Sequence, residues 1–292
     1  MSESVAAVVV NHDAGELLLR CVASLRAAGL DEIVVVDNAS SDGSLARLAA
    51  ADRRARLIPT GANRGYGAAA NRGVAACRAS FVLICNADLV VAPDVPGGLV
   101  AALLDDPTLG VCGPELRDPT GERYPSARRF PSYPLAALHA TLGLFAPDNR
   151  FSRRYRREDE PDEVAPDWVS GACMAVRRVA FESIGGFDEG YFMYVEDLDL
   201  CWRLRRAGWS VGYLPGALVT HVQGASTRRR PLRMLLVHHY STWRFAQKSA
   251  RGPERALLPA VALFLAARLA VSLARELARA GSARDRAAEG AE

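Results

Sequence analysis

Residues 32–43 read EIVVVDNASSDG, an unbroken β-branched run that stops at an aspartate and a string of small polar residues. A run without polar alternation is typical of a strand buried on both faces of a sheet. Similar runs at 5–10, 56–59 and 81–85 are separated by helical patterns at 16–28, 44–51 and 67–78. This alternation predicts an α/β fold with a mostly parallel central sheet and helices on both faces.

Polar side chains follow all four apolar runs. The candidate residues at these ends, with Gly65 and Ala87 between or beside the polar ones, are Asn11 and Asp13; Asp37, Asn38 and Ser40; Asn63, Arg64 and Gly65; and Asn86, Ala87 and Asp88. Ligands of open α/β sheets bind outside the carboxyl ends of the strands, so these residues are expected to line one site. Helix capping and turns would explain any single group. Four groups at the same edge favour a binding site.

An acidic residue ends the fourth group, Asn86-Ala87-Asp88. The Asp88 carboxylate could hold Mg²⁺ or Mn²⁺, which needs only one or two protein carboxylates when it also binds diphosphate oxygens. His221 closes a later predicted strand and is a candidate third ligand or phosphate contact. The competing interpretations are an aspartate that caps a turn and a histidine that is simply packed.

Three carboxylates, Glu196, Asp197 and Asp199, stand within four positions at the start of a predicted helix. Acidic residues in a first turn often only complement the helix dipole. Aromatic residues at 191–194 are expected to shield these carboxylates from water, and a shielded carboxylate can act as a general base. Asp199 is spaced to pair with Arg203, so Glu196 and Asp197 are the catalytic candidates.

Together these motifs resemble those of family 2 inverting glycosyltransferases, over residues 5 to about 226. VVVNHD at 8–13, VVDNASSDG at 35–43, NRGYG at 63–67, NRG at 71–73 and NAD at 86–88 are similar to the donor half of that family. WVSGA at 168–172, GFDE at 186–189 and EDLDL at 196–200 with Arg203 are similar to the acceptor half. NAD stands where many relatives carry Asp-x-Asp, a variant of the rhamnosyltransferase-like branch, so metal binding would rest mainly on Asp88.

The resemblance implies a GT-A fold, with a catalytic domain at 1–226 that divides into a donor-nucleotide half at 1–90 and an acceptor half at 91–226. It implies that Asp37 contacts the nucleobase and that Asn11 and Asp13 lie near base and ribose. Further implied site residues are Asn38, Ser40, Asn63, Arg64, Gly65 and Asn71 for the nucleotide; Asn86, Ala87, Asp88 and His221 for the diphosphate and metal; and Trp168, Gly171 and Ala172 for the acceptor.

The same resemblance implies a reaction. Asp197 would take the proton from an acceptor hydroxyl, with Glu196 as its orienting neighbour or as the alternative base, and the hydroxyl would displace the nucleoside diphosphate in one inverting step. The pattern favours L-rhamnose from dTDP-L-rhamnose and a lipid-linked or polysaccharide acceptor in cell-envelope assembly. A UDP- or GDP-sugar donor stays open, as does a non-catalytic nucleotide-sugar-binding module.

Composition and missing motifs disfavour several other classes of protein. A net charge of +3 on 292 residues gives no general signature of nucleic-acid binding. None of the six cysteines forms a CxxC pair, so we expect small buried residues in a reducing compartment. No GxGxxG follows the first run, which disfavours a dinucleotide-dependent oxidoreductase, and the Gly-rich basic loop of a nucleotidyltransferase is also missing there. The N-terminus lacks the features of a secretory signal, so a cytoplasmic protein is expected.

The rest of the chain predicts less regular structure. We expect loops at 114–166, one strand at 167–177, and two short strands at 210–214 and 217–221. A helical region is expected at 227–280, broken at Gly252-Pro253. The last residues, 281–292, are polar and predict a disordered tail.

The apolar segment 256–274 carries a single charge, Arg268. Three interpretations stay open: a helix that lies on a membrane, a helix buried by packing or in a homodimer, and a transmembrane span. An arginine at the centre of a span costs roughly 2.5–3.5 kcal/mol, which favours the first. The basic stretch 228–233 suits an anionic membrane surface. We therefore expect a peripheral protein on the inner face of the plasma membrane.

Overall fold

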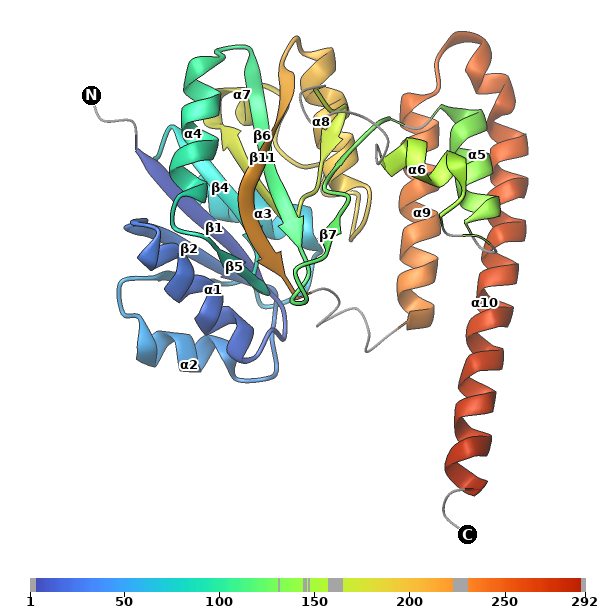
Figure 1. Cartoon of the computed structure of the whole chain (residues 1–292), viewed down its shortest axis with the longest axis horizontal. Helices are drawn as coiled ribbons and strands as arrows, with labels where there is room; N and C mark the ends of the chain where they lie inside the picture. The colour runs from blue at the N-terminus through green and yellow to red at the C-terminus, as the bar shows by residue number, and fades with distance from the viewer. Residues whose placement is uncertain are drawn as a thin grey trace. The chain divides into compact units, whose positions relative to one another are not determined.

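The computed structural model describes residues 4–130, 132–143, 146, 148–156, 165–222 and 231–289 (Figure 1). The chain forms two compact units. One comprises Met1–Phe192 with Glu196–Ser226, and the other comprises Met193–Val195 with Thr227–Glu292. All of the predicted site residues belong to the first unit.

The first half of this unit has the predicted parallel arrangement. Strands β1 (Val5–Asn11), β2 (Glu32–Asp37), β3 (Arg56–Pro59) and β4 (Phe81–Asn86) pair in parallel in the order β3-β2-β1-β4. Helices α1 (Glu16–Ala27), α2 (Ser44–Ala51) and α3 (Tyr66–Ala76) connect the strands. The register sets Asn11 opposite Asp37 and Val10 opposite Asn86, so the polar strand ends meet at one edge of the sheet.

Helices cover both faces of this half because its strands are apolar on both faces. One core joins the sheet to α1 and to α4 (Val95–Asp105); its members include Ala7, Val9, Val35, Leu83, Leu18, Leu25 and Leu99. On the other face, α3 lies so close to β1 and β2 that a Cβ at Gly73 would overlap Val8 and lie 3.0 Å from Val36. Glycine is what permits this approach.

The sheet continues into a half of mixed direction. Strand β10 (Cys173–Arg177) runs antiparallel between β4 and β6 (Leu109–Arg117), and β11 (Ser210–His221) runs parallel to β6. Strand β5 (Leu89–Val91) pairs antiparallel with β11, and β7 (Arg123–Tyr124) with β6. A separate two-stranded sheet pairs β8 (Ala127–Arg128) with β9 (Trp168–Val169). The helices of this half are α5 (Tyr133–Leu142), α6 (Arg150–Arg156), α7 (Arg178–Ser183) and α8 (Glu196–Arg206).

Two predicted strand assignments in this half are wrong. Residues 167–177 form two strands, β9 and β10, because the turn between them bonds elsewhere: Ser170 N donates to Ser126 O at 2.8 Å, and Asn86 N donates to Ala172 O at 2.9 Å. Residues 210–221 form one strand, β11, whose register shifts between Leu214 and Leu218. This irregularity accommodates a proline, which lacks an N–H, and Gly216 at φ 84°.

The second unit is helical. Helix α9 (Pro231–Ser249) is followed by a 3₁₀ turn (Gly252–Leu257) and by α10 (Leu258–Glu289), so the chain breaks at the predicted Gly252-Pro253. The segment Gly252–Ala278 is long and apolar enough to cross a membrane by length and composition. Helix α10 runs through 281–289, where a disordered tail is predicted, since Ala, Arg and Glu favour helix. Residues 290–292 and the first half of the predicted basic stretch, 228–230, lie outside the described residues.

Candidate active site

The ends of β1 and β2 are locked together by a buried polar network. Asn11 Nδ2 lies 2.7 Å from Asp37 Oδ1, 3.1 Å from Ser40 Oγ and 3.0 Å from Ser44 Oγ. Asp37 also accepts hydrogen bonds from the hydroxyl and the backbone N–H of Ser40. A carboxylate offers about four acceptor positions, so one position of Asp37 remains for a ligand. Asn11 Oδ1 is buried and has no hydrogen-bond partner among the described residues.

The loops beyond these strand ends are also joined. Ser41 N donates to Asp13 Oδ1 at 2.7 Å, and Gly15 N donates to Asp42 Oδ2 at 2.7 Å. Burial tends to raise the pKa of Asp42, but hydrogen bonds from Ser44 and Gly15 outweigh it and lower the pKa. Asp13 therefore shapes the loop that borders the predicted nucleotide site.

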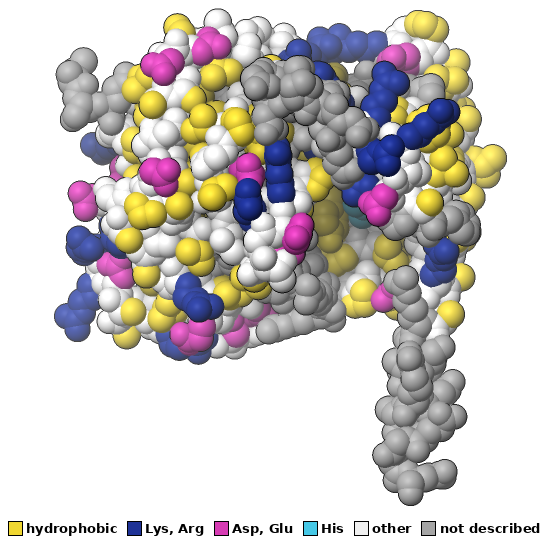
Figure 2. Space-filling view, in the orientation of Figure 1, with side chains coloured by type: hydrophobic (Ala, Val, Ile, Leu, Met, Phe, Trp, Pro, Cys, Tyr) yellow, Lys and Arg dark blue, Asp and Glu magenta, His cyan; other side chains and the backbone are white. Residues whose placement is uncertain are grey.

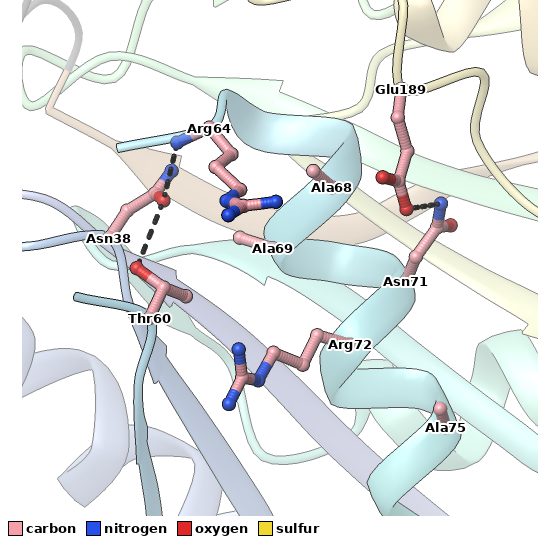
Figure 3. A pocket seen from close by; sticks show the side chains of 9 residues that line it. All are labelled: Asn38, Thr60, Arg64, Ala68, Ala69, Asn71, Arg72, Ala75 and Glu189. Atoms are coloured by element: carbon pink, nitrogen blue, oxygen red, sulfur yellow. Dashed lines mark hydrogen bonds between the residues drawn. The ribbon is translucent and has the colours of Figure 1, made fainter. Parts of the chain in front are cut away.

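A cavity of about 440 Å³ contains three of the predicted donor residues, Asn38, Arg64 and Asn71 (Figure 3). Asn38 accepts from Arg64 N at 3.2 Å and donates to Gly65 O at 2.9 Å, while Asn71 donates to Glu189 at 3.0 Å. The guanidinium groups of Arg64 and Arg72 both reach into the cavity. Neither Asn11 nor Asp37 lines it, so the predicted donor residues divide between this cavity and the β1–β2 network.

The turn before α3 connects the two halves of the unit. Asn63 Oδ1 accepts from Gly65 N at 3.0 Å, and Gly65 has φ 97°. A Cβ at Gly65 would overlap the backbone oxygen of Phe192. The next residue, Tyr66, donates from its backbone N to Phe192 O at 3.0 Å and from its hydroxyl to Gly171 O at 2.5 Å. The sequence interpretation missed Tyr66.

Asp88 and His221, the two predicted metal ligands, are in direct contact. His221 Nε2 lies 3.1 Å from Asp88 Oδ1 and 3.4 Å from Asn86 Nδ2, and His221 Nδ1 is bonded to the hydroxyl of Tyr124. Among the described residues no group of three or more His, Cys, Asp and Glu could hold a metal. One carboxylate and one imidazole still fit Mg²⁺ or Mn²⁺ if a diphosphate supplies the remaining oxygens. Tyr124 was not predicted.

Glu196 and Asp197 begin α8, where Glu196 is buried and Asp197 is partly buried. Asp197 Oδ2 accepts from Gly171 N and Oδ1 from Leu198 N, both at 2.8 Å. Burial raises the pKa of Asp197, although these hydrogen bonds and the charge of Arg128 oppose the rise. Burial, together with the charge of Asp197, raises the pKa of Glu196 to about 8. Glu196 Oε2 has no hydrogen-bond partner.

Asp199 has the structural role that its spacing predicts. Its side chain is fully buried and is bound by Arg203 Nε at 2.6 Å and by the Tyr191 hydroxyl at 3.3 Å. These two donors satisfy Asp199 and hold α8 against the aromatic stretch that precedes it. Asp199 is therefore not available as a base.

One turn, at 170–172, brings the donor and acceptor sides together. Its Ala172 O accepts from Asn86 at the end of β4, and its Gly171 N donates to Asp197 at the start of α8. Gly171 and Ala172 therefore position their neighbours through the backbone. Trp168, the third predicted acceptor residue, is 5% exposed, donates to Arg129 O at 3.0 Å, and has its ring 4.9 Å from the guanidinium of Arg128.

The fold is that of GT-A glycosyltransferases, which combine a parallel nucleotide-binding half with an acceptor half in one continuous sheet. The chain belongs to glycosyl transferase family 2, whose family model matches residues 6–185. It is a glycosyltransferase.

The relatives of this chain include rhamnosyltransferases. It is 41% identical over 272 residues to the N-acetylglucosaminyl-diphospho-decaprenol L-rhamnosyltransferase of two strains of Mycobacterium tuberculosis, covering 88% of this chain and 89% of the relative. It is 37% identical over 120 residues to rhamnosyltransferase WbbL of Escherichia coli, covering 41% of this chain and 43% of that protein.

Solved structures share the fold. Mannosyltransferase PcManGT from Pyrobaculum calidifontis, in complex with GDP-Man and Mn²⁺, superposes with a TM-score of 0.58 at 19% identity, covering 96% of this chain and 79% of that one. TarS 1–349 of S. aureus in complex with UDP superposes with a TM-score of 0.54 at 15% identity, covering 82% of this chain and 64% of that one. These likenesses agree with the GT-A fold predicted from the sequence.

Proposed function

We propose that the protein transfers L-rhamnose from dTDP-L-rhamnose to a hydroxyl of a lipid-linked diphosphate sugar in cell-envelope assembly. The observation that carries this proposal is the 41% identity to the mycobacterial rhamnosyltransferase, because it extends over 88% of this chain and so beyond the family domain that ends at 185. That relative is named for an N-acetylglucosaminyl-diphospho-decaprenol substrate.

The donor nucleotide would bind at the ends of β1 and β2. A thymine or uracil ring presents an imide N–H, which suits the open acceptor position of Asp37. Asn38, Arg64 and Asn71 would bind other parts of the nucleotide from the adjacent cavity, where Arg64 supplies positive charge. Asp13, Ser40, Asn63 and Gly65 hold the loops of this pocket in place.

Asp88 and His221 would hold a divalent cation, Mg²⁺ or Mn²⁺, and Asn86 would stay hydrogen-bonded beside them. When bound, such an ion offsets the negative charge that grows on the departing nucleoside diphosphate. The Mn²⁺ in the PcManGT complex supports a divalent ion at this kind of site.

Asp197 would act as the base. Its raised pKa makes it a stronger proton acceptor than an exposed aspartate, while two backbone N–H donors keep its carboxylate oriented. Glu196, with a pKa of about 8, is protonated near neutral pH and is therefore not the base there. Asp197 would take the proton of the acceptor hydroxyl as its oxygen attacks the anomeric carbon opposite the leaving group, so that one displacement inverts the configuration.

We also place the protein at the cytoplasmic face of the membrane, peripherally bound through its C-terminal helices. Large apolar side chains are exposed there, among them Leu263 at 73%, Leu277 at 59% and Val271 at 45%. A lipid-linked acceptor would present its sugar at that surface.

The test is transfer by the purified full chain. It would be incubated with dTDP-, UDP- and GDP-sugars and a short-chain prenyl diphosphate N-acetylglucosamine, with Mg²⁺, Mn²⁺ or EDTA, and products would be identified by mass. We expect a rhamnosylated product and dTDP only with dTDP-L-rhamnose and a cation. Asp197→Asn and Asp88→Ala should each lower the rate by roughly 10²–10⁴-fold. A product from a UDP- or GDP-sugar instead would overturn the donor assignment.

A further inference from the structure

Arg128 is a partly buried cation without an acidic partner. In the part of the chain that the structure describes, it forms no ion pair within 4.0 Å. Its Nε donates to Pro125 O at 3.0 Å, and its guanidinium lies 4.9 Å from the Trp168 ring centroid and 6.0 Å from that of Tyr155. Removing a cation from water is costly unless an anion accompanies it. Arg128 has no acidic side chain at ion-pair distance among the described residues, and the Asp197 carboxylate interacts with it only from further away.

Arg128 lies on the acceptor side of the base. Its charge acts on the Asp197 carboxylate and opposes the effect of burial on the pKa. Its strand, β8, pairs with β9, and β9 leads directly into the turn whose Gly171 N binds Asp197. An anion on Arg128 would thus be near the hydroxyl that Asp197 deprotonates.

The neighbouring helix adds positive charge. Helix α6 reads RFSRRYR, and Arg129 N donates to Tyr155 O of this helix at 3.4 Å. Figure 2 shows basic side chains gathered over the region where α6 lies in Figure 1. A group of like charges with an aromatic platform attracts an anion more strongly than one arginine alone.

We propose that Arg128, supported by Trp168 and Tyr155, binds the diphosphate that links the acceptor sugar to its lipid. This rests on the proposed function and names the part of the acceptor that the enzyme recognises. The reacting hydroxyl and the anomeric phosphate of a sugar are separated by a single ring, so an acceptor whose hydroxyl lies at Asp197 would carry its phosphate one sugar ring away, on the side where the charge of Arg128 acts. The planar guanidinium matches two phosphate oxygens, and the indole and phenol faces hold it in place.

The experiment compares two acceptors in the full-length enzyme: a short-chain prenyl diphosphate N-acetylglucosamine and an alkyl N-acetylglucosaminide without phosphate. Arg128→Gln should raise KM for the diphosphate acceptor by roughly 10- to 100-fold relative to its effect on the alkyl acceptor. Arg128→Lys should recover part of the loss, because it restores charge without the planar fork. KM for the donor should stay unchanged.

Arg206→Gln is the matched control, since Arg206 stacks on Trp202 at 5.0 Å and is exposed on α8. It should alter neither acceptor. An equal loss with both acceptors in Arg128→Gln would overturn the inference and leave Arg128 as a positioning residue for Asp197. If the wild-type enzyme used only the alkyl acceptor, the proposed function would fail, and this inference with it.

Discussion

Glu196 and Asp197 are adjacent carboxylates, the first buried and the second partly buried, and burial raises the pKa of both. They differ in their hydrogen bonds: Asp197 accepts from two backbone N–H groups, whereas Glu196 Oε2 has no partner. Backbone N–H donors therefore oppose the effect of burial more strongly at Asp197 than at Glu196.

The raised pKa of Glu196 makes the free energy of unfolding depend on pH. The pKa of Glu196 is about 8 in the folded chain against an ordinary value of 4.5, so between these pH values the folded state holds a proton that the unfolded state has lost. Folding stability should therefore fall as pH rises through this window. Glu196→Gln does not titrate, and its melting temperature relative to wild type should be higher at pH 8 than at pH 5.

The matched control is Glu182→Gln, because the Glu182 side chain is 60% exposed beside Arg178. Its melting temperature relative to wild type should not change with pH. If the difference in melting temperature between wild type and Glu196→Gln stayed constant from pH 5 to pH 8, Glu196 would not be buried as described.

Tyr124 is predicted to orient His221 for metal binding. A ligating imidazole needs its second nitrogen held by a partner, and the Tyr124 hydroxyl binds His221 Nδ1. Tyr124→Phe should weaken Mn²⁺ binding in the presence of dTDP by roughly tenfold, as followed by electron paramagnetic resonance of the free ion. Tyr213→Phe, which removes a hydroxyl bound to Arg123, is the control. Unchanged Mn²⁺ affinity in folded Tyr124→Phe would remove Tyr124 from the site.

The site residues that could be foreseen are those whose chemistry is carried by a local motif. Asp88, Asp197 and the Asp199–Arg203 pair stand out in short stretches of sequence. The roles of Tyr66, which stands within the NRGYG motif, and of Tyr124 do not, because their partners, Gly171 and His221, are 105 and 97 residues away along the chain. A tyrosine next to a distant glycine or histidine leaves no pattern in the sequence, so only the folded chain reveals it.

At the level of elements, strands β1 to β4 could be predicted from the sequence because they are buried on both faces. A short continuous apolar run of this kind is compatible with few structures other than a buried strand. The strand assignments that failed, at 167–177 and 210–221, depend on partners elsewhere. The turn at 170–172 forms because Ser126 and Asn86 take its backbone groups, and neither residue is near it in sequence. Strand β11 continues past its proline and glycine because β6 pairs with it on both sides of the irregularity.

The close packing of α3 on the sheet gives a matched pair of substitutions. Gly73→Ala should destabilise the protein by about 1–3 kcal/mol, because its Cβ would overlap Val8. Gly97→Ala in α4 meets nothing within 4 Å and should stabilise by about 0.5–1 kcal/mol through the lower entropy of its unfolded chain. Urea unfolding of both variants measures the difference. A Gly73→Ala protein as stable as wild type would refute the close approach.

At the scale of the whole molecule, the helical unit explains how an apolar segment can contain the charged residue Arg268. His239 Nδ1 donates to Leu235 O at 2.8 Å, which leaves Nε2 free to accept from Arg268 at 3.1 Å. The single charge of the apolar segment is therefore bound by α9, and it need not reach water. Large apolar side chains elsewhere on α10 remain exposed, Leu263 at 73% above all. Such a surface, on a glycosyltransferase with a relative named for a decaprenol-linked substrate, favours contact with a membrane.

Leu263→Glu tests that contact in the full chain. Exposed leucine gains about 1.5–3 kcal/mol when it enters an apolar phase, so its replacement should weaken binding to anionic phospholipid vesicles by at least roughly tenfold in a flotation assay. Val179→Glu makes a similar change at a residue that is 60% exposed on α7 in the catalytic unit, and it should leave vesicle binding unchanged. Wild-type protein should be released by alkaline carbonate, since a peripheral helix is extractable and a span is not. If the protein stayed in the membrane fraction after alkaline carbonate, the helix would be a transmembrane span. If Leu263→Glu bound vesicles fully but no longer formed a homodimer, this face would instead be a contact between two copies of the chain.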